Sequence, residues 1–183
     1  MTTPLLDHAG IAARIPHSGA MCLLGELDAW DRDHVVCHAA SHRDPAHPLR
    51  TASGLLSPCA IEYAAQAMAL HGALIGAAAG RPATPGYLAS ARGVRLHRLR
   101  LDDLAGDLRV EARRGAGDAR QILYTFAISH AGEPVADGRA TVVLNTPLAP
   151  VTSARLPARA LIDPPAAASA ARSPNGWRAT VRM

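Results

Sequence analysis

The chain has few aromatic residues and few cysteines, and each shortage excludes a class of protein. Aromatic residues make up 3% of the 183 residues, so the core must be aliphatic, and no lysine cluster interleaved with aromatics suggests nucleic acid. The cysteines, Cys22, Cys37 and Cys59, are odd in number and form no CxxC pair. We therefore expect reduced cytoplasmic thiols, with no disulfide framework, no metal site and no nucleic-acid partner.

The sequence also predicts neither a membrane-spanning helix nor a targeting segment. No basic segment followed by an apolar run stands at the N-terminus, so no signal peptide is predicted. Residues 60–79 approach membrane-spanning length, but Glu62, Gln66 and His71 interrupt them, which favours a buried core helix. The net charge of +4 fits a partner with an acidic surface and equally fits an arginine-rich solvated surface.

The central stretch of the chain, residues 47–79, reads as a histidine-bearing loop followed by a helix that is apolar almost all round. Ser57 is a suitable N-cap, and Pro58 suits the first helical position, where no amide hydrogen is needed. Glu62 and Gln66, four residues apart, share one face of the first turns. A carboxylate on so apolar a helix needs a partner or a function, because burying an unpaired charge is costly.

Two interpretations of these polar residues stay open. Glu62 is either a functional acid or a structural carboxylate bound to Arg50 or Arg92. Gln66 is either a satisfied core amide or a helper that donates a hydrogen bond to Glu62.

The remainder of the chain predicts a short N-terminal helix and a largely antiparallel sheet. The expected strands, separated by tight turns, are residues 21–30, 34–40, 87–101, 107–114, 121–130 and 134–145. One long apolar helix with such a sheet predicts an α+β fold over residues 1–146, in which the sheet curls around the helix. Residues 147–183 are rich in proline and alanine and are interpreted as a poorly ordered tail, with a docked helix as the alternative.

Three segments carry a resemblance to a known family. They are Ile15-Pro16-His17 leading into residues 21–24, then His47-Pro48-Leu49, and then the helix start from Glu62 to Ala69. Over about residues 5–145 the chain resembles the hot-dog β-hydroxyacyl-acyl-carrier-protein dehydratases, and most of all the dehydratase-like proteins of aryl polyene gene clusters. It departs from their pattern at Ala46, where they have glycine, and at residues 56–58, which replace their proline-glycine. The spacing from His47 to Glu62 is also one residue longer.

The resemblance implies dehydration of a 3-hydroxyacyl thioester, which needs a base, an acid and donors for an enolate-like oxygen. A histidine suits the base because its pKa lies near the working pH. His47 matches the family position best; His17 is a second candidate and His42 a third. Glu62 would be the acid, provided that burial keeps it protonated. The oxygen would be bound by free amides of the first helical turn, from Cys59 or Ala60, with Gln66 as a positioning group.

The resemblance also implies partners. In this family two protomers pair their sheets edge to edge, and each cavity takes its histidine from one protomer and its acid from the other. A homodimer or a heterodimer with a related hot-dog chain is therefore expected. The substrate brings its own phosphopantetheine on an acidic acyl carrier protein, so no cofactor is expected. Arg92, Arg95 and Arg98 are candidates for the carrier-protein dock, or else solvated side chains on a strand face. A hot-dog thioesterase and a non-catalytic supporting subunit are the alternative functions.

Overall fold

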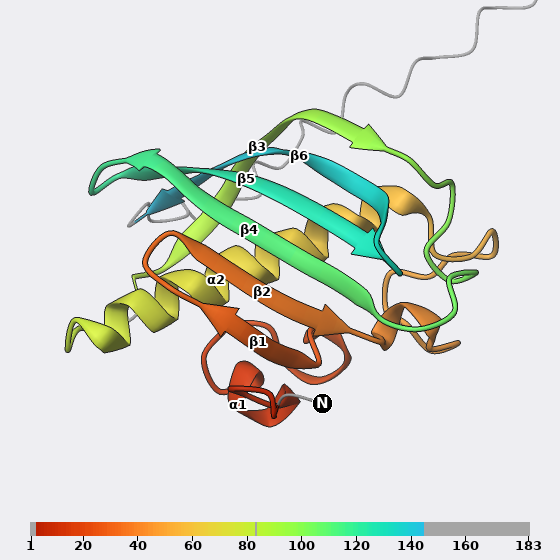
Figure 1. Ribbon diagram of the computed structural model, residues 1–183, viewed down its shortest axis with the longest axis horizontal. Coiled ribbons are helices and arrows are strands. Elements are labelled where there is room, and N and C mark those ends of the chain that lie inside the picture. Colours follow the sequence, from red (N-terminus) through yellow and green to blue (C-terminus); the bar gives the residue numbers. More distant parts are fainter. Residues whose placement is uncertain (1–2, 83, 145–183) are drawn as a thin grey trace, which may run out of the picture. The chain divides into compact units, whose positions relative to one another are not determined.

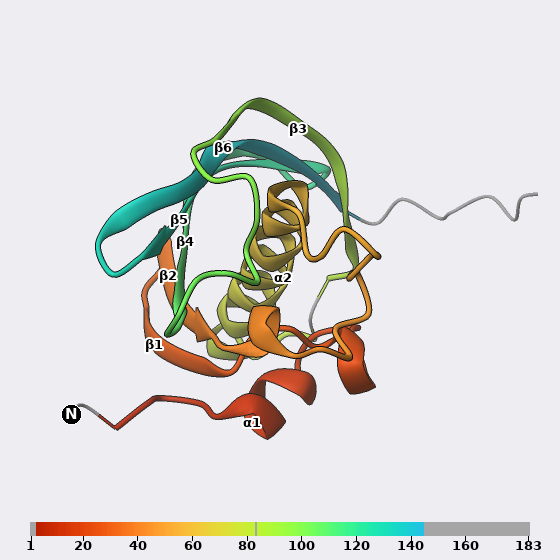
Figure 2. The same cartoon turned by 90° about the vertical axis from the view of Figure 1, so that its right-hand side faces the viewer.

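One six-stranded antiparallel sheet curls around one long helix (Figures 1 and 2). The structure, a computed structural model, describes residues 3–82 and 84–144. The strands lie in the order β1-β2-β4-β5-β6-β3, with α2 (Ala60–Ala78) inside the curl. Their bounds are β1 Glu26–Trp30, β2 His34–Ala39, β3 Gly86–Leu96, β4 Leu108–Gly117, β5 Gln121–His130 and β6 Glu133–Leu144. The predicted α+β hot-dog architecture is confirmed; the predicted tail, residues 147–183, lies outside the described residues.

The two-residue period of the strands decides which side chains meet the helix. In β5, Ile122, Tyr124, Phe126 and Ile128 are buried, whereas the residues between them are exposed. The buried set faces α2, which contributes Tyr63, Ala64, Ala67 and Leu70 as fully buried side chains. Alternating burial therefore gives the sheet an inner face against α2 and an outer face turned away from it.

The first strand is shorter than predicted. Residues 21–25 do not pair as a strand; instead, Leu23 uses both of its backbone polar groups on side chains. Its N–H donates to Gln66 Oε1 at 2.8 Å, and its carbonyl accepts from Ser41 Oγ at 2.8 Å. These partners satisfy the backbone of the buried Leu23 without a neighbouring strand, and pairing with β2 starts only at Gly25, whose N–H donates to His38 O.

The helix start also differs from the prediction. A 3₁₀ turn, Ser57–Cys59, precedes α2, so the helix proper begins at Ala60. Ser57 was predicted as the N-cap, and this is wrong: its hydroxyl donates to the carbonyl of Arg98 and makes no capping bond. The strand predicted at residues 107–114 is longer than expected, because β4 continues to Gly117.

The two edges of the sheet differ in whether another segment pairs with them. The N-terminal segment before α1 (His8–Ala12) covers β1, since Leu5 N–H donates to Leu27 O and Leu27 N–H donates to Leu6 O. On the other side of the sheet, β3 pairs only with β6 among the described residues. An unpaired strand edge is a natural site for association with another sheet.

A buried carboxylate anchors the loop that leads into α2. Asp102, with a side chain 1% exposed, accepts from Nε and Nη2 of Arg100 at 2.9 and 2.8 Å and lies 2.6 Å from Arg50 Nη2. The hydrogen bonds from Arg100 lower the pKa of Asp102 to about 2. Gly54 passes so close, at a φ of +96°, that a Cβ there would lie 2.7 Å from Asp102 Oδ2. The loop conformation therefore requires glycine at this position.

Asp102→Asn should lower the free energy of unfolding by about 1–3 kcal/mol at pH 7, because it removes charge-assisted hydrogen bonds. The folded-state pKa lies below the ordinary 3.8, so this stabilisation is complete above about pH 4 and is lost as the pH falls toward 2. Urea unfolding at several pH values measures it. Asp103→Asn removes the same charge from an exposed neighbour and is the control. Equal stability of the two variants at pH 7 would contradict the anchoring role.

Candidate active site

A cavity of about 550 Å³ lies between α2 and the inner face of the sheet, and Pro16 and His17 close one part of it. On the helix side it is lined by a stripe of residues at helical spacing: Glu62, Ala65, Met68, Ala69 and Gly72. On the sheet side it is lined by the start of β3 and by Ile122, Tyr124 and Val142. The lining is therefore mainly apolar. Its charged or titratable side chains include Arg14 as well as His17 and Glu62, which meet at the first turns of the helix.

His17 and Glu62 contact each other inside this cavity. His17 Nε2 lies 3.2 Å from Glu62 Oε1, and their side chains are 26% and 30% exposed. The second carboxyl oxygen, Oε2, makes no hydrogen bond within the described part of the chain, and His17 Nδ1 is buried without a partner there. Neither arginine proposed as a structural partner binds Glu62, since Arg50 binds Asp102 and Arg92 lies on the outer face of the sheet.

Gln66 holds Glu62 in place. Its side chain is fully buried, and its Nε2 donates to Glu62 Oε1 at 2.9 Å and to the carbonyl of Met21 at 2.8 Å, while its Oε1 accepts from Leu23. The amide thus satisfies the buried segment before β1 and orients the carboxyl at the same time. Gln66 is therefore both a satisfied core amide and a residue that donates a hydrogen bond to Glu62.

His47 lies on another side of the helix, in a chain of hydrogen bonds that uses both ring nitrogens. Leu49 N–H donates to His47 Nδ1 at 3.1 Å, and His47 Nε2 lies 3.0 Å from the Tyr63 hydroxyl. Tyr63 lies 2.9 Å from Ser41 Oγ, which itself donates to Leu23 O. The only consistent assignment has His47 Nε2–H donating to Tyr63 and Tyr63 donating to Ser41. With 4% exposure, His47 does not line the cavity.

Three buried histidines are kept neutral by their surroundings. Burial lowers the pKa of His42, His47 and His71 below the ordinary 6.5. His42 is fully buried, with Nε2 3.2 Å from the carbonyl of Leu104. His71 Nε2 donates to Asp31 O at 2.9 Å, and its Nδ1 lies 3.1 Å from the hydroxyl of Tyr124. None of the three contacts Glu62, so the third candidate base, His42, is also separate from the carboxyl.

The amides proposed as oxyanion donors are occupied. In the 3₁₀ turn before α2, Cys59 N–H donates to Leu56 O and Ala60 N–H donates to Ser57 O. Neither amide is free for a substrate oxygen, so this geometry gives the predicted oxyanion role no support. Burial raises the pKa of the Cys59 thiol, which argues against its use as a nucleophile.

The three arginines proposed as a dock are not equivalent. Arg95 Nε and Nη2 donate to Asp137 Oδ1 at 2.9 and 2.6 Å, so its charge is matched within the chain. Arg92 and Arg98 are exposed and form no ion pair among the described residues. Within residues 3–82 and 84–144, no group of three His, Cys, Asp or Glu side chains gathers as a metal site would require. No helix in this part of the chain is long and apolar enough to cross a membrane.

Tyr63 is a structural residue that the sequence analysis did not single out. It follows Glu62 in the helix and is fully buried, and burial raises the pKa of its hydroxyl to about 12. A polar aromatic on a mainly apolar helix was the available signal, since a buried tyrosine hydroxyl needs a hydrogen-bond partner.

Comparison with known proteins gives a family and a fold. The model of the ApeP-like family, described as ApeP dehydratase, matches residues 9–152. Among solved structures, the dehydratase heterocomplex ApeI:P from Xenorhabdus doucetiae is similar, with 21% identity and a TM-score of 0.68 over 80% of this chain and 94% of that one. A thioesterase from Haemophilus influenzae has 14% identity and a TM-score of 0.52, over 79% and 94%. No curated protein matches the chain.

The buried histidines predict how stability varies with pH. Their folded-state pKa values lie below 6.5, so below about pH 6.5 the unfolded chain binds more protons than the folded one. The free energy of unfolding should therefore decrease from pH 7.5 to pH 5.5, as measured by urea unfolding. His47→Gln should make this dependence shallower. An unchanged slope in the variant would show that His47 is not held neutral in the fold.

Proposed function

Because the chain belongs to the ApeP-like dehydratase family, we propose that it acts in the dehydration of 3-hydroxyacyl thioesters to trans-2-enoyl thioesters. The observation that supports this most directly is the 3.2 Å contact between His17 Nε2 and Glu62 Oε1 in a mainly apolar cavity. A histidine beside a carboxyl supplies the base and the acid that the elimination requires.

In the proposed step, neutral His17 accepts the proton from C2 of the substrate at Nε2. The electrons of that bond form the C2–C3 double bond, the C3–O bond breaks, and the hydroxyl leaves as water with a proton from Glu62. His17 is then an imidazolium and Glu62 a carboxylate, 3.2 Å apart. Direct transfer of the proton from Nε2 back to Glu62 restores both groups, so no further carrier of protons is needed.

The cavity favours an acyl chain as the substrate. From Glu62 to Gly72 the lining helix face rises by about 15 Å, at 1.5 Å per residue. Its members between these ends, Ala65, Met68 and Ala69, are apolar and mostly small, so they leave room along the helix without offering polar partners. An extended hydrocarbon chain suits such a groove, with its thioester end beside His17 and Glu62.

We further propose that the substrate arrives on an acyl carrier protein, whose phosphopantetheine replaces any cofactor of the chain's own. A second hot-dog chain is the proposed partner, as in the similar structure, which is a heterocomplex. The unpaired side of β3 offers the edge for such pairing. The resemblance implies a base and an acid from different protomers, whereas here His17 and Glu62 of one chain already meet. The partner would then complete the cavity without having to supply the histidine.

Glu62→Gln should lower the rate at least about 100-fold, because it removes a general acid. His17→Ala should cause a comparable loss, while His47→Ala should retain turnover per folded molecule, since His47 contacts Tyr63 and not Glu62. Dehydration of a 3-hydroxyacyl pantetheine thioester, followed by ultraviolet absorbance, measures all three. Folding is checked by circular dichroism. Normal turnover in Glu62→Gln, or a loss confined to His47→Ala, would contradict the assignment.

The same assay separates the alternative functions. Release of free thiol without formation of the enoyl product would identify a thioesterase. Activity that appears only when a second hot-dog chain is added, and that survives both Glu62→Gln and His17→Ala, would identify a supporting subunit. The proposed dehydratase requires enoyl product and sensitivity to both substitutions.

A further inference from the structure

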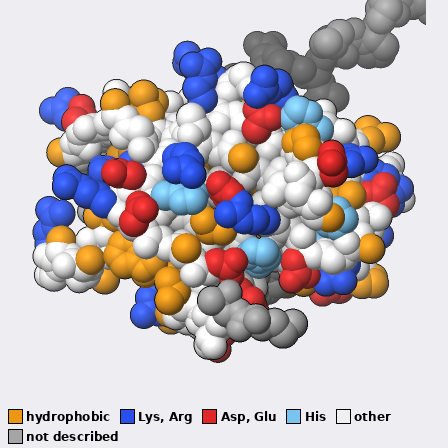
Figure 3. Space-filling view, viewed as in Figure 1, with side chains coloured by type: hydrophobic (Ala, Val, Ile, Leu, Met, Phe, Trp, Pro, Cys, Tyr) orange, Lys and Arg blue, Asp and Glu red, His pale blue; other side chains and the backbone are white. Residues whose placement is uncertain are grey.

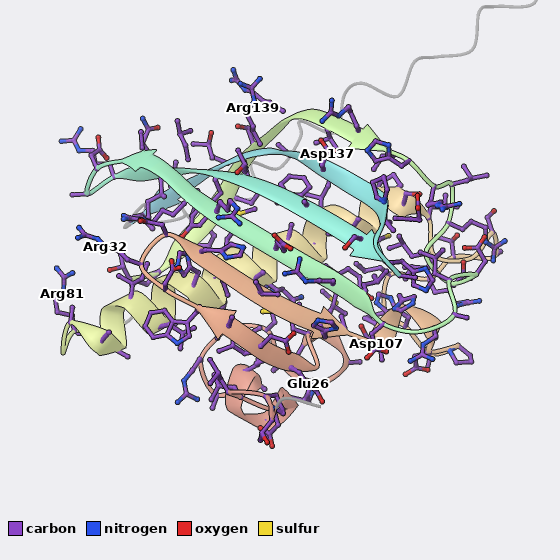
Figure 4. The ribbon with its side chains drawn as sticks, in the orientation of Figure 1. Glu26, Arg32, Arg81, Asp107, Asp137 and Arg139 are labelled. Carbon is purple, nitrogen blue, oxygen red and sulfur yellow. The ribbon has the colours of Figure 1, made fainter. Side chains whose placement is uncertain are left out.

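A row of three arginines crosses the outer face of the sheet, which is turned away from α2. The strand registers place Arg92 of β3 opposite Arg139 of β6, Arg139 opposite Thr125 of β5, and Thr125 opposite Arg113 of β4. Figure 3 is viewed toward this side of the sheet, and Figure 4 shows Arg139 pointing away from the ribbon. We call Arg92, Arg139 and Arg113 the basic row.

The basic row carries charge that the described part of the chain does not neutralise. None of its three arginines forms an ion pair there, and like charges directly opposite each other, as at Arg92 and Arg139, destabilise a sheet. Two carboxylates face the same side on β6 and β4, and both are already bound. Asp137 binds Arg95 and His97, and Glu111 binds Arg109 and His34.

The basic row lines a groove of about 740 Å³. Thr125 lies within the row, and the adjacent row across the strands adds Ser90, Thr141 and Leu123, whose side chain is 47% exposed, to the lining of the groove. Cations combined with an exposed apolar side chain are typical of a surface that binds protein.

The spacing of the row distinguishes an acidic protein from a small anion. Arg92 and Arg113 are three strands apart, which is about 14 Å at about 4.8 Å per strand. One phosphate group cannot reach both ends of such a row. Carboxylates at positions i, i+4 and i+7 of a helix span about 10 Å, and their side chains extend that reach.

We propose that the basic row is the docking surface for an acidic face of a partner protein, presented by a helix. Under the proposed function, on which this identification rests, that partner is the acyl carrier protein. The position of the groove supports this, because β3 and β6 contribute to both this groove and the cavity that holds His17 and Glu62, and Tyr124 lines both. The dock is thus centred on Arg92, Arg113 and Arg139, whereas Arg95, bound to Asp137, is outside it.

The test compares Arg113→Ala/Arg139→Ala with Arg109→Ala in the full chain. Arg109 lies on the same face of β4, but its charge is matched by Glu111, so it is the control. The double variant should bind a phosphopantetheinylated carrier protein at least about tenfold more weakly, by isothermal titration calorimetry at low salt. It should also raise KM for a carrier-bound substrate and leave turnover of the free pantetheine thioester unchanged. Arg109→Ala should match the wild type in all three measurements.

The outcomes separate this inference from the proposed function. Wild-type carrier affinity in the double variant overturns the dock, even if the pantetheine thioester is dehydrated normally. Loss of carrier affinity in the double variant supports the dock, even if no dehydration is seen with either substrate. Inorganic phosphate that competes with the carrier at equal concentration, or a second hot-dog chain that needs the same arginines while the carrier does not, also overturns it.

Discussion

The site depends on one buried amide. Gln66 donates to Glu62 and to the carbonyl of Met21, and it accepts from the N–H of Leu23. Each of these groups lies at or near the interior, where an unsatisfied polar atom costs about 1–3 kcal/mol. The amide therefore joins the segment that carries His17 to the helix that carries Glu62. The contact between His17 and Glu62 is therefore supported by the hydrogen bonds of a third residue.

Hydrogen bonding also distinguishes the candidate histidines, between which the sequence alone cannot choose. His47 has one nitrogen committed to a backbone N–H and the other to Tyr63, so its tautomer is set and its lone pair is used. His17 has its Nε2 beside Glu62 and stays partly exposed in the cavity. His17 therefore differs from His47 in having a ring nitrogen at the cavity, which is what the proposed base requires.

The sheet separates two kinds of surface through the alternation of its strands. Inward residues of β5 and β6, such as Ile122 and Val142, form the apolar wall of the cavity. Outward residues of the same strands, such as Thr125 and Arg139, form part of the basic groove. A docking surface and a substrate cavity can therefore share two strands, because adjacent residues point to opposite faces; Tyr124 is a residue that lines both.

The strand and helix patterns were enough to predict the fold and to single out Glu62 as the candidate acid. Period-two strands and a helix apolar on every side allow little besides a sheet curled around that helix, and Glu62 stands out because a carboxylate conflicts with such a helix. The tertiary structure decided which histidine meets Glu62, that Cys59 and Ala60 have no free amide hydrogens, and that Arg95 is matched while Arg139 is not. These outcomes depend on contacts between residues far apart in the chain, for which local spacing carries no information. The sequence pattern identifies the unusual side chains, but which of them are in contact follows only from how the chain packs.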